Sequence, residues 1–410
     1  MPVPKLRFRR EDGSVYTNLE SITLGERFTF RNGINASREA FRSEGIRCIG
    51  VSDVVKCLPI VAANIKGKVA ISEEEIRKNQ VNYGDVLFQR SSETKEDIGH
   101  ASVYYDNLPS VYNGFVICAK PDKLFYAPIY LHYALQHDRI RRQAVTLGAG
   151  TGQHYNIGQE GLSKIVITVP CLDEQRKISD FFSSIDEAIV QSEAEVRNYK
   201  RQKQAAMQKI FSREIRFRRE DGVDYPEWEE KSIAEIGTVI TGNTPPTKEK
   251  DNYGGSFLWV TPTDMSERPI INNTERKLTE IGKRKARLLP KGSVLVTCIA
   301  SIGKNCILSQ EGSCNQQINA IIPFSTTLSY YLLSIINFRK HELEVLGGNG
   351  GMKIVSKSLF ERFSIPVPCF EEQQKIAGFL SAYDEVIGYA EQELSKWEEL
   401  KRGLLQQMFV

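Results

Sequence analysis

Two short sequences occur twice in the 410-residue chain, and in the same order. Residues 6–13, LRFRREDG, return at 215–222 as IRFRREDG, with seven identities in eight at an offset of 209. Residues 169–178, VPCLDEQRKI, return at 367–376 as VPCFEEQQKI, with seven identities in ten at an offset of 198. Ordered repetition of this kind is the signature of a duplicated structural unit. The chain is therefore two modules of about 200 residues rather than two or three unrelated domains.

Each module ends in a long segment without proline, at residues 173–211 and 371–409. Apolar residues recur there at alternating spacings of four and three, which predicts two helices of about five heptads that form a coiled coil. Ser192 and Lys203 interrupt the first seam, and Lys401 repeats the lysine in the second. Such a lysine either fixes the register of the paired helices or extends from the seam edge to water, and both interpretations stay open. The seam residues are Ile178, Phe182, Ile185, Ile189, Val196, Tyr199, Ala206 and Ile210, then Ile376, Leu380, Tyr383, Ile387, Ala390, Leu394, Trp397, Leu404 and Met408.

The two helices have each other as natural partners, and sterics predict the direction of their pairing. A parallel pair would bring both globular parts to one end of the coil, where they would collide. An antiparallel pair places one globular part at each end and gives the molecule a pseudo-two-fold axis. It also brings the end of the second helix to the start of module one, so the arrangement is expected to be pseudo-cyclic.

The globular parts are predicted to be α+β, each with a twisted and mainly antiparallel sheet. Short β-branched segments such as 294–297 lie between Gly, Pro and Asn, while 128–142 and 328–344 are expected to be helical. Gly-rich segments at 148–152 and 347–351 either let the backbone approach a phosphate or only turn the chain into the next strand.

The net charge of +3 hides an uneven distribution along the chain. Residues 173–211 are neutral and residues 371–409 carry −4, which leaves +7 for the rest. Basic globular ends on a neutral-to-acidic rod suggest that the ends meet phosphate and the rod meets protein, although a single basic cluster is more often a solvated face. The clusters are Lys5, Arg7, Arg9 and Arg10; Arg139, Arg141 and Arg142; and Arg276, Lys277, Lys283, Arg284, Lys285, Arg287 and Lys291.

Motifs of catalytic chemistry are missing from the sequence. It has no G-x-x-x-x-G-K-[ST] phosphate loop, no Asp/Asn-Pro-Pro-aromatic motif of amino-methyltransferases and no histidine pair at zinc spacing. Cys298, Cys306 and Cys314 recur every eight residues, which could indicate a metal, but buried strand cysteines are the preferred interpretation. We expect a binding protein that is not an enzyme, with no metal and no cofactor of its own.

The location of the protein is also predicted. No apolar segment reaches the length of a membrane helix, and the N-terminal residues do not resemble a secretory signal. The eight cysteines contain no C-x-x-C pair, which favours free thiols in a reducing cytoplasm. A cytoplasmic protein without a membrane partner is expected.

The ordered, duplicated motifs resemble those of the specificity (S) subunit of type I restriction-modification systems. The resemblance rests on the doubled V-P-C-[LF]-[DE]-E-Q-[RQ]-K-I sequence and on the helix endings 206–211 and 404–409. In module two, Trp228, Glu229, Lys231, the segment Ile240-Thr241-Gly242-Asn243-Thr244-Pro245 and the segment Asn315-Gln316-Gln317 match the family's usual opening and loops. Module one departs from this pattern, with Tyr16-Thr17-Asn18-Leu19 and Arg31-Asn32-Gly33-Ile34 at the corresponding places.

The resemblance implies two target-recognition domains, at 1–170 and 215–368, and two spacer helices, at 171–214 and 369–410. Each domain would read one half of a bipartite, gapped sequence in double-stranded DNA, and the helices would set the spacing. The helices would also dock two modification subunits, which bind S-adenosylmethionine and methylate adenine. Separate restriction (motor and endonuclease) subunits would cleave unmodified DNA, and the chain itself would be a non-catalytic specificity subunit.

Candidate DNA-binding residues are loop side chains that suit base edges or phosphates. Each taken singly is more often an ordinary turn or cap residue. The candidates in module two are Thr241, Asn243, Thr244, Lys248, Thr263, Asp264, Lys304, Gln316, Gln317 and Lys353. By positional analogy, those in module one are Arg31, Asn35, Arg38, Ser52, Asp53, Arg90, Ser91, Ser92, Gln153, His154 and Tyr155.

Two other classes of function remain at this point. A stand-alone regulatory or architectural DNA-binding protein would keep sequence-specific binding without an enzyme partner. A coiled-coil scaffold whose globular ends bind protein would show no steep salt-dependent affinity for DNA.

Overall fold

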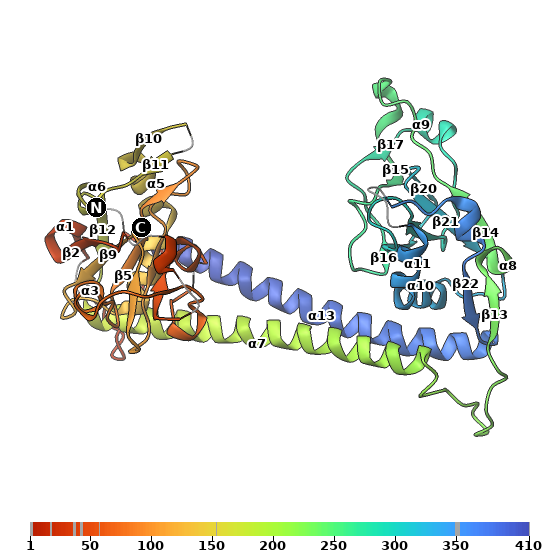
Figure 1. Ribbon diagram of the computed structural model, residues 1–410, viewed down its shortest axis with the longest axis horizontal. Helices are drawn as coiled ribbons and strands as arrows, with labels where there is room; N and C mark the ends of the chain where they lie inside the picture. Colours follow the sequence, from red (N-terminus) through yellow and green to blue (C-terminus); the bar gives the residue numbers. More distant parts are fainter. Residues whose placement is uncertain are drawn as a thin grey trace. The chain divides into compact units, whose positions relative to one another are not determined.

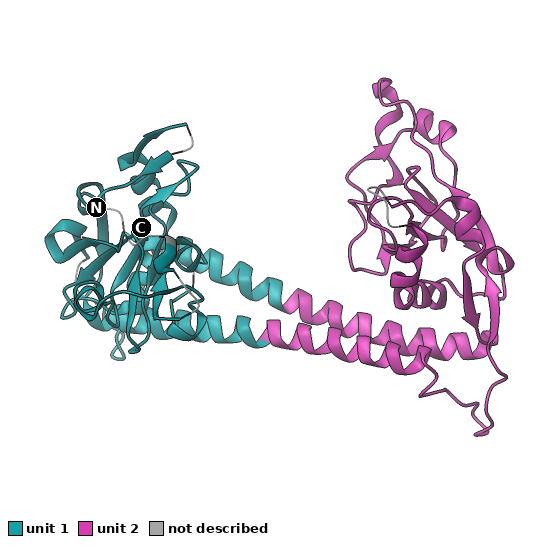
Figure 2. Cartoon of the chain, viewed as in Figure 1, with its two compact units in different colours: residues 1–191, 394–410 teal, residues 192–393 magenta. Residues whose placement is uncertain are grey.

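The computed structural model describes residues 3–16, 19–35, 38–41, 44–56, 58–152, 154–348 and 353–409, with Arg38 described for its backbone only. It divides into two compact units (Figure 2). Unit 1 comprises residues 1–191 and 394–410, and unit 2 comprises residues 192–393. Each unit therefore combines one globular domain with a part of each long helix.

The globular domain of unit 1 contains mixed, mainly antiparallel sheets with short helices (Figure 1). Its strands are β1 (Glu20–Thr23), β2 (Phe28–Asn32), β3 (Ile46–Ile49), β4 (Lys68–Val69), β5 (Val86–Gln89), β6 (Ser91–Ser92), β7 (Ala101–Val103), β8 (Ser110–Tyr112), β9 (Val116–Pro121), β10 (Ala149–Thr151), β11 (His154–Asn156) and β12 (Val166–Val169). Its helices are α1 (Leu24–Arg27), η1 (Arg38–Ala40), α2 (Val51–Val54), η2 (Ala62–Asn64), α3 (Glu73–Asn79), α4 (Pro128–Gln136), α5 (Asp138–Leu147) and α6 (Gln159–Ser163). The sheet orders are β2-β9-β5-β7, β4-β3-β8, β10-β11-β6 and β1-β12, and only the β3–β8 pair is parallel among these described strands.

The globular domain of unit 2 repeats this plan. Its strands are β13 (Glu229–Ser232), β14 (Gly237–Thr241), β15 (Tyr253–Val260), β16 (Ile270–Ile271), β17 (Lys277–Leu278), β18 (Val294–Thr297), β19 (Asn305–Leu308), β20 (Gly312–Cys314), β21 (Ile318–Pro323) and β22 (Ser364–Val367). Its helices are α8 (Ile233–Ile236), η3 (Lys250–Asn252), α9 (Glu280–Lys285), α10 (Ser329–Phe338), α11 (Lys340–Leu346) and α12 (Lys357–Glu361). The orders β17-β15-β20 and β13-β22 match β4-β3-β8 and β1-β12, and β14-β21-β18-β19 matches β2-β9-β5-β7 with β16 added at its edge. The pair β15–β20 is parallel like β3–β8, and β16–β19 is parallel as well. The sheet β10-β11-β6 has no counterpart among the described strands of unit 2.

The two long helices are α7 (Leu172–Phe211) and α13 (Phe370–Met408), within one residue of their predicted bounds. In each unit they run side by side in opposite directions, which confirms the antiparallel pairing (Figure 1). In unit 1, Phe182 of α7 packs against Phe409, with ring centroids 5.8 Å apart. The backbone N–H of Leu6 donates to the Gln407 carbonyl at 3.0 Å, so the end of α13 lies beside the start of module one as predicted.

The lysines on the helix seam form ion pairs across it. In unit 2, Lys203 Nζ lies 2.6 Å from a carboxylate oxygen of Asp384, and both side chains are 17% exposed. The hydroxyl of Tyr330, from α10, donates to the same carboxylate. Since Lys203 binds the facing helix, it does not extend to water. Unit 1 repeats the arrangement with Lys401, Asp186 and Tyr133.

The repeated VPC and RFRREDG sequences join each globular domain to its long helix. In unit 2 the guanidinium of Arg216 lies 3.1 Å from the fully buried carboxylate of Glu372, to which Trp228 Nε1 also donates at 2.9 Å. Gln373 accepts from the backbone of Leu328 at 2.9 Å, at the start of α10. Unit 1 repeats both contacts with Arg7, Glu174, Gln175 and Ala127.

The predicted helices 128–142 and 328–344 are wrong as single helices. The first is divided into α4 and α5 at His137, whose backbone is extended (φ −61°, ψ 140°). His137 caps the second half, since its imidazole accepts from the backbone N–H of Arg139 at 3.4 Å. The second divides into α10 and α11 at Arg339.

The three regularly spaced cysteines lie in the sheets of unit 2. Cys306 is in β19, Cys314 ends β20 and Cys298 directly follows β18, and all three are buried. Burial raises the pKa of Cys298 to about 11 and that of Cys306 to about 12. The preferred interpretation as buried strand cysteines is confirmed.

Candidate nucleic-acid interface

The loop that follows β14 in unit 2 is held by close contact with the turn between β20 and β21. The backbone N–H of Asn243 donates to the Cys314 carbonyl at 2.9 Å. A Cβ atom at Gly242 would lie 2.3 Å from the Asn315 carbonyl oxygen, so only glycine allows this approach. Thr244 Oγ1 donates to Gln316 Oε1 at 2.5 Å, which links the loop to the tip of the turn.

The exposed side chain of Gln316 keeps its amide nitrogen available, because none of the described residues accepts from it. Gln317 is more constrained, since its side-chain oxygen accepts from Asn315 Nδ2 at 2.9 Å. Thr241 donates to Asn319 Oδ1 at 2.7 Å. A glutamine with a free amide can both donate to and accept from a base edge.

Both polar atoms of the Asn243 side-chain amide form hydrogen bonds inside the protein. Its Nδ2 donates to the Lys285 carbonyl at 2.8 Å, and its Oδ1 accepts from the backbone N–H of Arg287 at 2.7 Å. Arg287 in turn donates to the Thr241 carbonyl at 2.7 Å. Asn243 therefore holds the shape of the loop through both atoms of its amide.

Two lysines lie on neighbouring segments beside this turn. Lys304 and Lys353 are exposed and form no ion pair with the described residues. The backbone of Cys298 donates to the Gln317 carbonyl at 2.8 Å, and that of Ala300 donates to the Lys353 carbonyl at 3.0 Å. The backbone of Thr297, beside Cys298, donates to the Lys304 carbonyl at 2.9 Å. These contacts bring both lysines to the same end of the sheet as the glutamines, where ammonium groups can neutralise phosphates.

The remaining candidates of unit 2 are less central. The Asp264 carboxylate accepts from the backbone N–H groups of Thr261 and Glu275 at 2.8 and 2.7 Å, so it stabilises a turn. The hydroxyl of Thr263 bonds that of Thr261 at 2.8 Å. Lys248 is exposed in the turn before η3.

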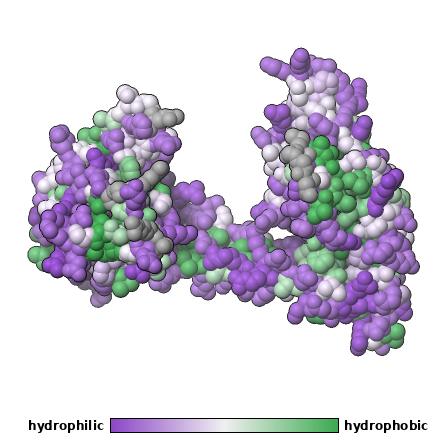
Figure 3. All heavy atoms as spheres, viewed as in Figure 1, coloured by the Kyte–Doolittle hydropathy of each residue, from purple (hydrophilic) through white to green (hydrophobic). Residues whose placement is uncertain are grey.

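The basic segment around α9 is partly neutralised. Lys283 Nζ lies 2.7 Å from Glu311, and Lys285 pairs with Glu249, which holds the pKa of that carboxyl below its usual range. The exposed side chains of Arg284 and its neighbours Arg276 and Lys291 have no ion pair among the described residues. This end of unit 2, where α9 and β17 lie, is hydrophilic in the view of Figure 3.

Unit 1 builds the same turn from different residues. The Asn113 backbone donates to Ile49 at 3.0 Å, as Asn315 does to Val260 at 2.9 Å. Asn113 Oδ1 accepts from the backbone N–H two residues later at 3.1 Å, as Asn315 Oδ1 does. A Cβ atom at Gly33 would lie 2.0 Å from the Asn113 carbonyl oxygen, which repeats the approach at Gly242.

Several candidates of unit 1 meet at this turn. The backbone N–H of Arg90 donates to the Phe115 carbonyl at 2.9 Å, and its guanidinium donates to the Gly114 carbonyl at 3.3 Å. A Cβ atom on Gly114 would lie 2.1 Å from Asn35 Oδ1, so Asn35 is adjacent as well. The sheet β10-β11-β6 adds Ser91, Ser92, His154 and Tyr155, with Tyr155 opposite Ser92.

The other candidates of unit 1 lie elsewhere or serve local structure. Asp53 accepts from the backbone N–H of Gly50 at 3.0 Å and lies 3.4 Å from Lys56, so it caps α2, on which Ser52 is exposed. Arg31 is exposed on β2. The side chain of Arg38 and all of Gln153 lie outside the described residues.

The Gly-rich segment of module one forms β10 and pairs with β11, as a turn into the next strand. Its counterpart in module two lies largely outside the described residues, at 349–352.

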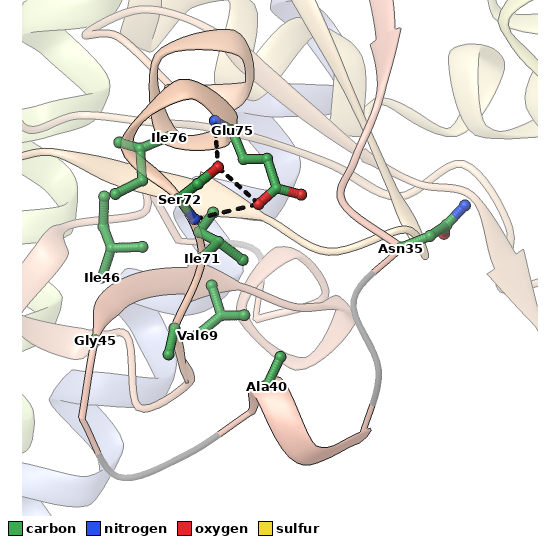
Figure 4. A pocket seen from close by; sticks show the side chains of 10 residues that line it. Asn35, Ala40, Gly45, Ile46, Val69, Ile71, Ser72, Glu75 and Ile76 are labelled. Atoms are coloured by element: carbon green, nitrogen blue, oxygen red, sulfur yellow. Dashed lines mark hydrogen bonds between the residues drawn. The ribbon is translucent and has the colours of Figure 1, made fainter.

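A pocket of about 780 Å³ lies beside Asn35, and both polar atoms and the apolar side chains of Ile46, Val69 and Ile76 line it (Figure 4). Its polar residues Ser72 and Glu75 bond one another in the cap of α3, with Ser72 Oγ donating to Glu75 at 3.0 Å. Asn35 stands apart from the apolar side chains in this view. The pocket offers no group of residues that points to a ligand.

Sequence reasoning missed the turn Asn113–Phe115, Asn319 and Asn156, and it named Arg287 only as part of a basic cluster. Asn319 accepts from Thr241, and Asn156 Oδ1 accepts from Ser91 Oγ at 2.5 Å. The signal for the turn is one shared asparagine before a β-branched strand, in Asn113-Gly-Phe-Val and Asn315-Gln-Gln-Ile.

Comparison with known proteins identifies this architecture. The model of the type I restriction modification DNA specificity domain matches residues 17–198 and again residues 225–399. The chain belongs to this family of type I restriction-modification specificity proteins. The two matches correspond to the two modules.

Two specificity subunits of Methanocaldococcus jannaschii are similar in sequence. The MjaIX subunit is 33% identical over 208 residues, which cover 49% of this chain and 48% of that protein. The putative MjaX subunit is 25% identical over 358 residues, which cover 82% of this chain and 80% of that protein. The EcoR124I/EcoR124II subunit of Escherichia coli is 30% identical over 187 residues, 43% of this chain and 45% of that protein. The chain thus spans about half of two of these relatives and most of the third.

Solved structures of the family share the fold. The S subunit of the type I system of M. genitalium has a TM-score of 0.61 at 15% identity, covering 100% of this chain and 99% of that chain. A chain from a structural study of complex assembly and conformational transition in a type I system has a TM-score of 0.59 at 15% identity, covering 95% of this chain and 97% of that chain.

The described residues contain neither a metal-ligand cluster nor a membrane-spanning helix. No cluster of three or more His, Cys, Asp or Glu side chains is placed to hold a metal ion. No helix in the same part of the chain has the length and apolar character needed to cross a membrane.

Proposed function

We propose that this chain is the non-catalytic DNA specificity subunit of a type I restriction-modification system. Its two globular domains, 1–170 and 215–368, would each read one half of a bipartite, gapped duplex target. The chain would position two adenine-methyltransferase subunits, and the motor and endonuclease subunits, on that target. The predicted cytoplasmic location agrees with this role.

The proposal rests on one observation: the two units share the backbone contacts of this turn but carry different polar side chains around it. The contacts of Gly33 and Asn113 in unit 1 repeat those of Gly242 and Asn315 in unit 2. Around this shared frame the polar side chains differ, with the half-buried Arg90 in one unit and the exposed Gln316 in the other. Two similar surfaces with different polar groups suit a target whose halves differ in sequence.

The chemistry of the surfaces supports DNA over a small ligand. Amide and guanidinium groups match the edges of adenine and guanine in the major groove. Exposed lysines such as Lys304 and Lys353 supply the sequence-independent attraction to phosphate. A scaffold that binds only protein has no need for this combination of amides and lysines beside the turn of unit 2.

Methylation-aware sequencing of a host with and without this gene tests the proposal. One bipartite adenine motif should appear only when the gene and its modification subunit are present. If purified chain binds specific duplex DNA but no motif depends on it, the protein is a stand-alone DNA-binding protein instead. Absence of salt-dependent DNA binding would favour the scaffold class.

Two substitutions in unit 2 separate base reading from phosphate contact. Gln316→Ala should weaken binding to the cognate duplex about 5- to 150-fold and relax the preference at one position, equivalent to about 1–3 kcal/mol. Lys304→Ala should weaken binding on all sequences and lower the salt slope by about 1. Gln202→Ala, an exposed glutamine on α7, is the matched control. Equal effects of the two glutamine variants would contradict the assignment of Gln316.

The spacer role of the helices is tested by their length. One added heptad in both α7 and α13 lengthens each helix by about 10.5 Å, which corresponds to about three base pairs of duplex. The tolerated gap between half-sites should grow by a similar amount. A gap that stays unchanged in a folded variant would refute the spacer role. Charge reversals on helix faces away from the seam should abolish binding of the modification subunit without unfolding the chain.

A further inference from the structure

A large aromatic side chain is exposed at the turn of unit 1 that carries candidate DNA-binding residues. Phe115 is 61% exposed, at the tip of the turn between β8 and β9. Its neighbours on this surface are polar, with the guanidinium of Arg90 bonded to the adjacent Gly114 carbonyl at 3.3 Å. A single exposed apolar residue is common on proteins, so its position and its support decide whether it has a role.

The position of Phe115 is defined by the internal repeat. Its backbone N–H donates to Asn113 Oδ1 at 3.1 Å, and the backbone N–H of Gln317 donates to Asn315 Oδ1 at 3.1 Å. Asn113 and Asn315 begin the same turn in the two units. Phe115 therefore occupies in unit 1 the place that Gln317 occupies in unit 2, within the loop surface assigned above to DNA.

The backbone of Phe115 is held firmly on both sides. In addition to the bond from its N–H, its carbonyl accepts from the backbone N–H of Arg90 at 2.9 Å. Only the two side-chain torsions of Phe115 therefore remain to be ordered when its ring binds. The positive charge of Arg90 beside it also attracts a polyanion to this place rather than an apolar protein surface.

We propose that Phe115 contacts a base of the half-site read by unit 1 through its ring, so that the two half-sites are read with different chemistry. This inference rests on the proposed function. The contact is apolar, either against the methyl group of a thymine in the major groove or against the face of a base at an opened step. Unit 2 would use the polar Gln317 and Gln316 at the same place.

Binding of the full chain to its motif duplex, titrated over a range of salt concentrations, tests the proposal. Phe115→Ala should weaken binding about 5- to 150-fold, the range found for aromatic contacts with bases. The slope of affinity against salt should stay unchanged, because an apolar contact releases no counterions. The loss should be confined to duplexes that contain the unit 1 half-site. Leu124→Ala is the matched control, because Leu124 is 81% exposed and follows the same strand that Phe115 precedes.

Two probes in the duplex identify the contact. Replacing each thymine of the half-site by uracil should remove the difference between wild type and Phe115→Ala at one position if the ring meets a methyl group. A 2-aminopurine at the contacted step should brighten with wild type but not with Phe115→Ala if the ring opens the stack. Equal affinities of Phe115→Ala, Leu124→Ala and wild type would overturn the proposal. Failure of wild type to bind any motif duplex would instead refute the proposed function.

Discussion

Replacing Lys203 by methionine probes the charged pair on the helix seam. Breaking a buried ion pair costs about 3–5 kcal/mol, and breaking an exposed one costs about 0–1 kcal/mol. Lys203 and Asp384 are each 17% exposed, close to the buried case, but the Tyr330 hydroxyl remains bonded to Asp384 in the variant. We therefore expect the free energy of opening the helix pair in unit 2 to fall by about 2 kcal/mol.

Hydrogen exchange measured by mass spectrometry reports this loss segment by segment. Amides of α7 and α13 within unit 2 should exchange about 30-fold faster in Lys203→Met, as about 2 kcal/mol requires. Lys209→Met is the control, because Lys209 is exposed near the end of the same helix and has no ion pair among the described residues. Replacing Asp384 by leucine as well should recover most of the loss, since an apolar pair can substitute for a buried ionic one.

The pH dependence of this loss has a defined sign. Burial raises the pKa of Asp384 above its usual range, and Lys203 opposes the rise. Without Lys203 the folded-state pKa of Asp384 rises further, so the folded state binds the proton more tightly than the unfolded state does. The destabilisation by Lys203→Met should be largest at neutral pH and shrink as pH falls through that folded-state pKa. A loss that does not vary with pH, or equal exchange in Lys203→Met and Lys209→Met, would refute the reasoning.

Three further changes address other parts of the structure. Arg216→Met leaves the fully buried carboxylate of Glu372 without its cation, so the free energy of unfolding in urea should fall by about 3 kcal/mol. Arg218→Met, at an exposed ion pair, should lower it much less, and similar losses in the two variants would contradict the burial argument. Gly242→Ala should lower the melting temperature, because its Cβ would meet a carbonyl oxygen at 2.3 Å. Gly378→Ala lies in open space on α13 and should raise the free energy of unfolding by up to about 1 kcal/mol. Changes in stability of the same sign in both variants would count against both assignments. Thiol labelling at neutral pH should be slow at Cys306, whose pKa burial raises to about 12, and rapid labelling of a folded sample there would exclude its burial. The half-buried cysteines that should react faster are Cys171 and Cys369.

The long helices were predictable because their signal is local and repeated. A seam that recurs every three or four residues over about five heptads specifies both the helix and the face that it buries. The bounds of α7 and α13 therefore agree with the prediction within one residue. The break at His137 was not predictable in the same way, because it depends on one extended residue inside an otherwise helical pattern.

The repeated motifs were visible in the sequence, but the reason for them was not. Arg216 and Glu372 lie 156 residues apart, and neither position alone indicates that one binds the other. The structure shows that the identical residues of the two copies make the same contact in each unit. Shared sequence in this chain therefore marks the joint between globular domain and helix.

The loop residues were the hardest to predict, because the offset between the two copies changes within each module. Gly33 corresponds to Gly242 at an offset of 209, but Asn113 corresponds to Asn315 at an offset of 202. Insertions and deletions between the strands change the offset within a module, so an alignment of the copies loses the turns. Hydrogen bonds between distant strands restore the correspondence, and with it the place of Phe115.

The interleaving of the two units has a consequence for how the chain is made. The core of unit 1 includes Met408 and Phe409, which pack with Tyr130 and Phe182. All residues of unit 2 have been translated once residue 393 is added, whereas unit 1 also needs residues 394–410. The domain that is translated first is thus completed last, because the rings of Tyr130 and Phe182 cannot pack against Phe409 until α13 has been synthesised. A ribosome that stops within α13 would release a chain whose second domain can fold while its first domain stays open.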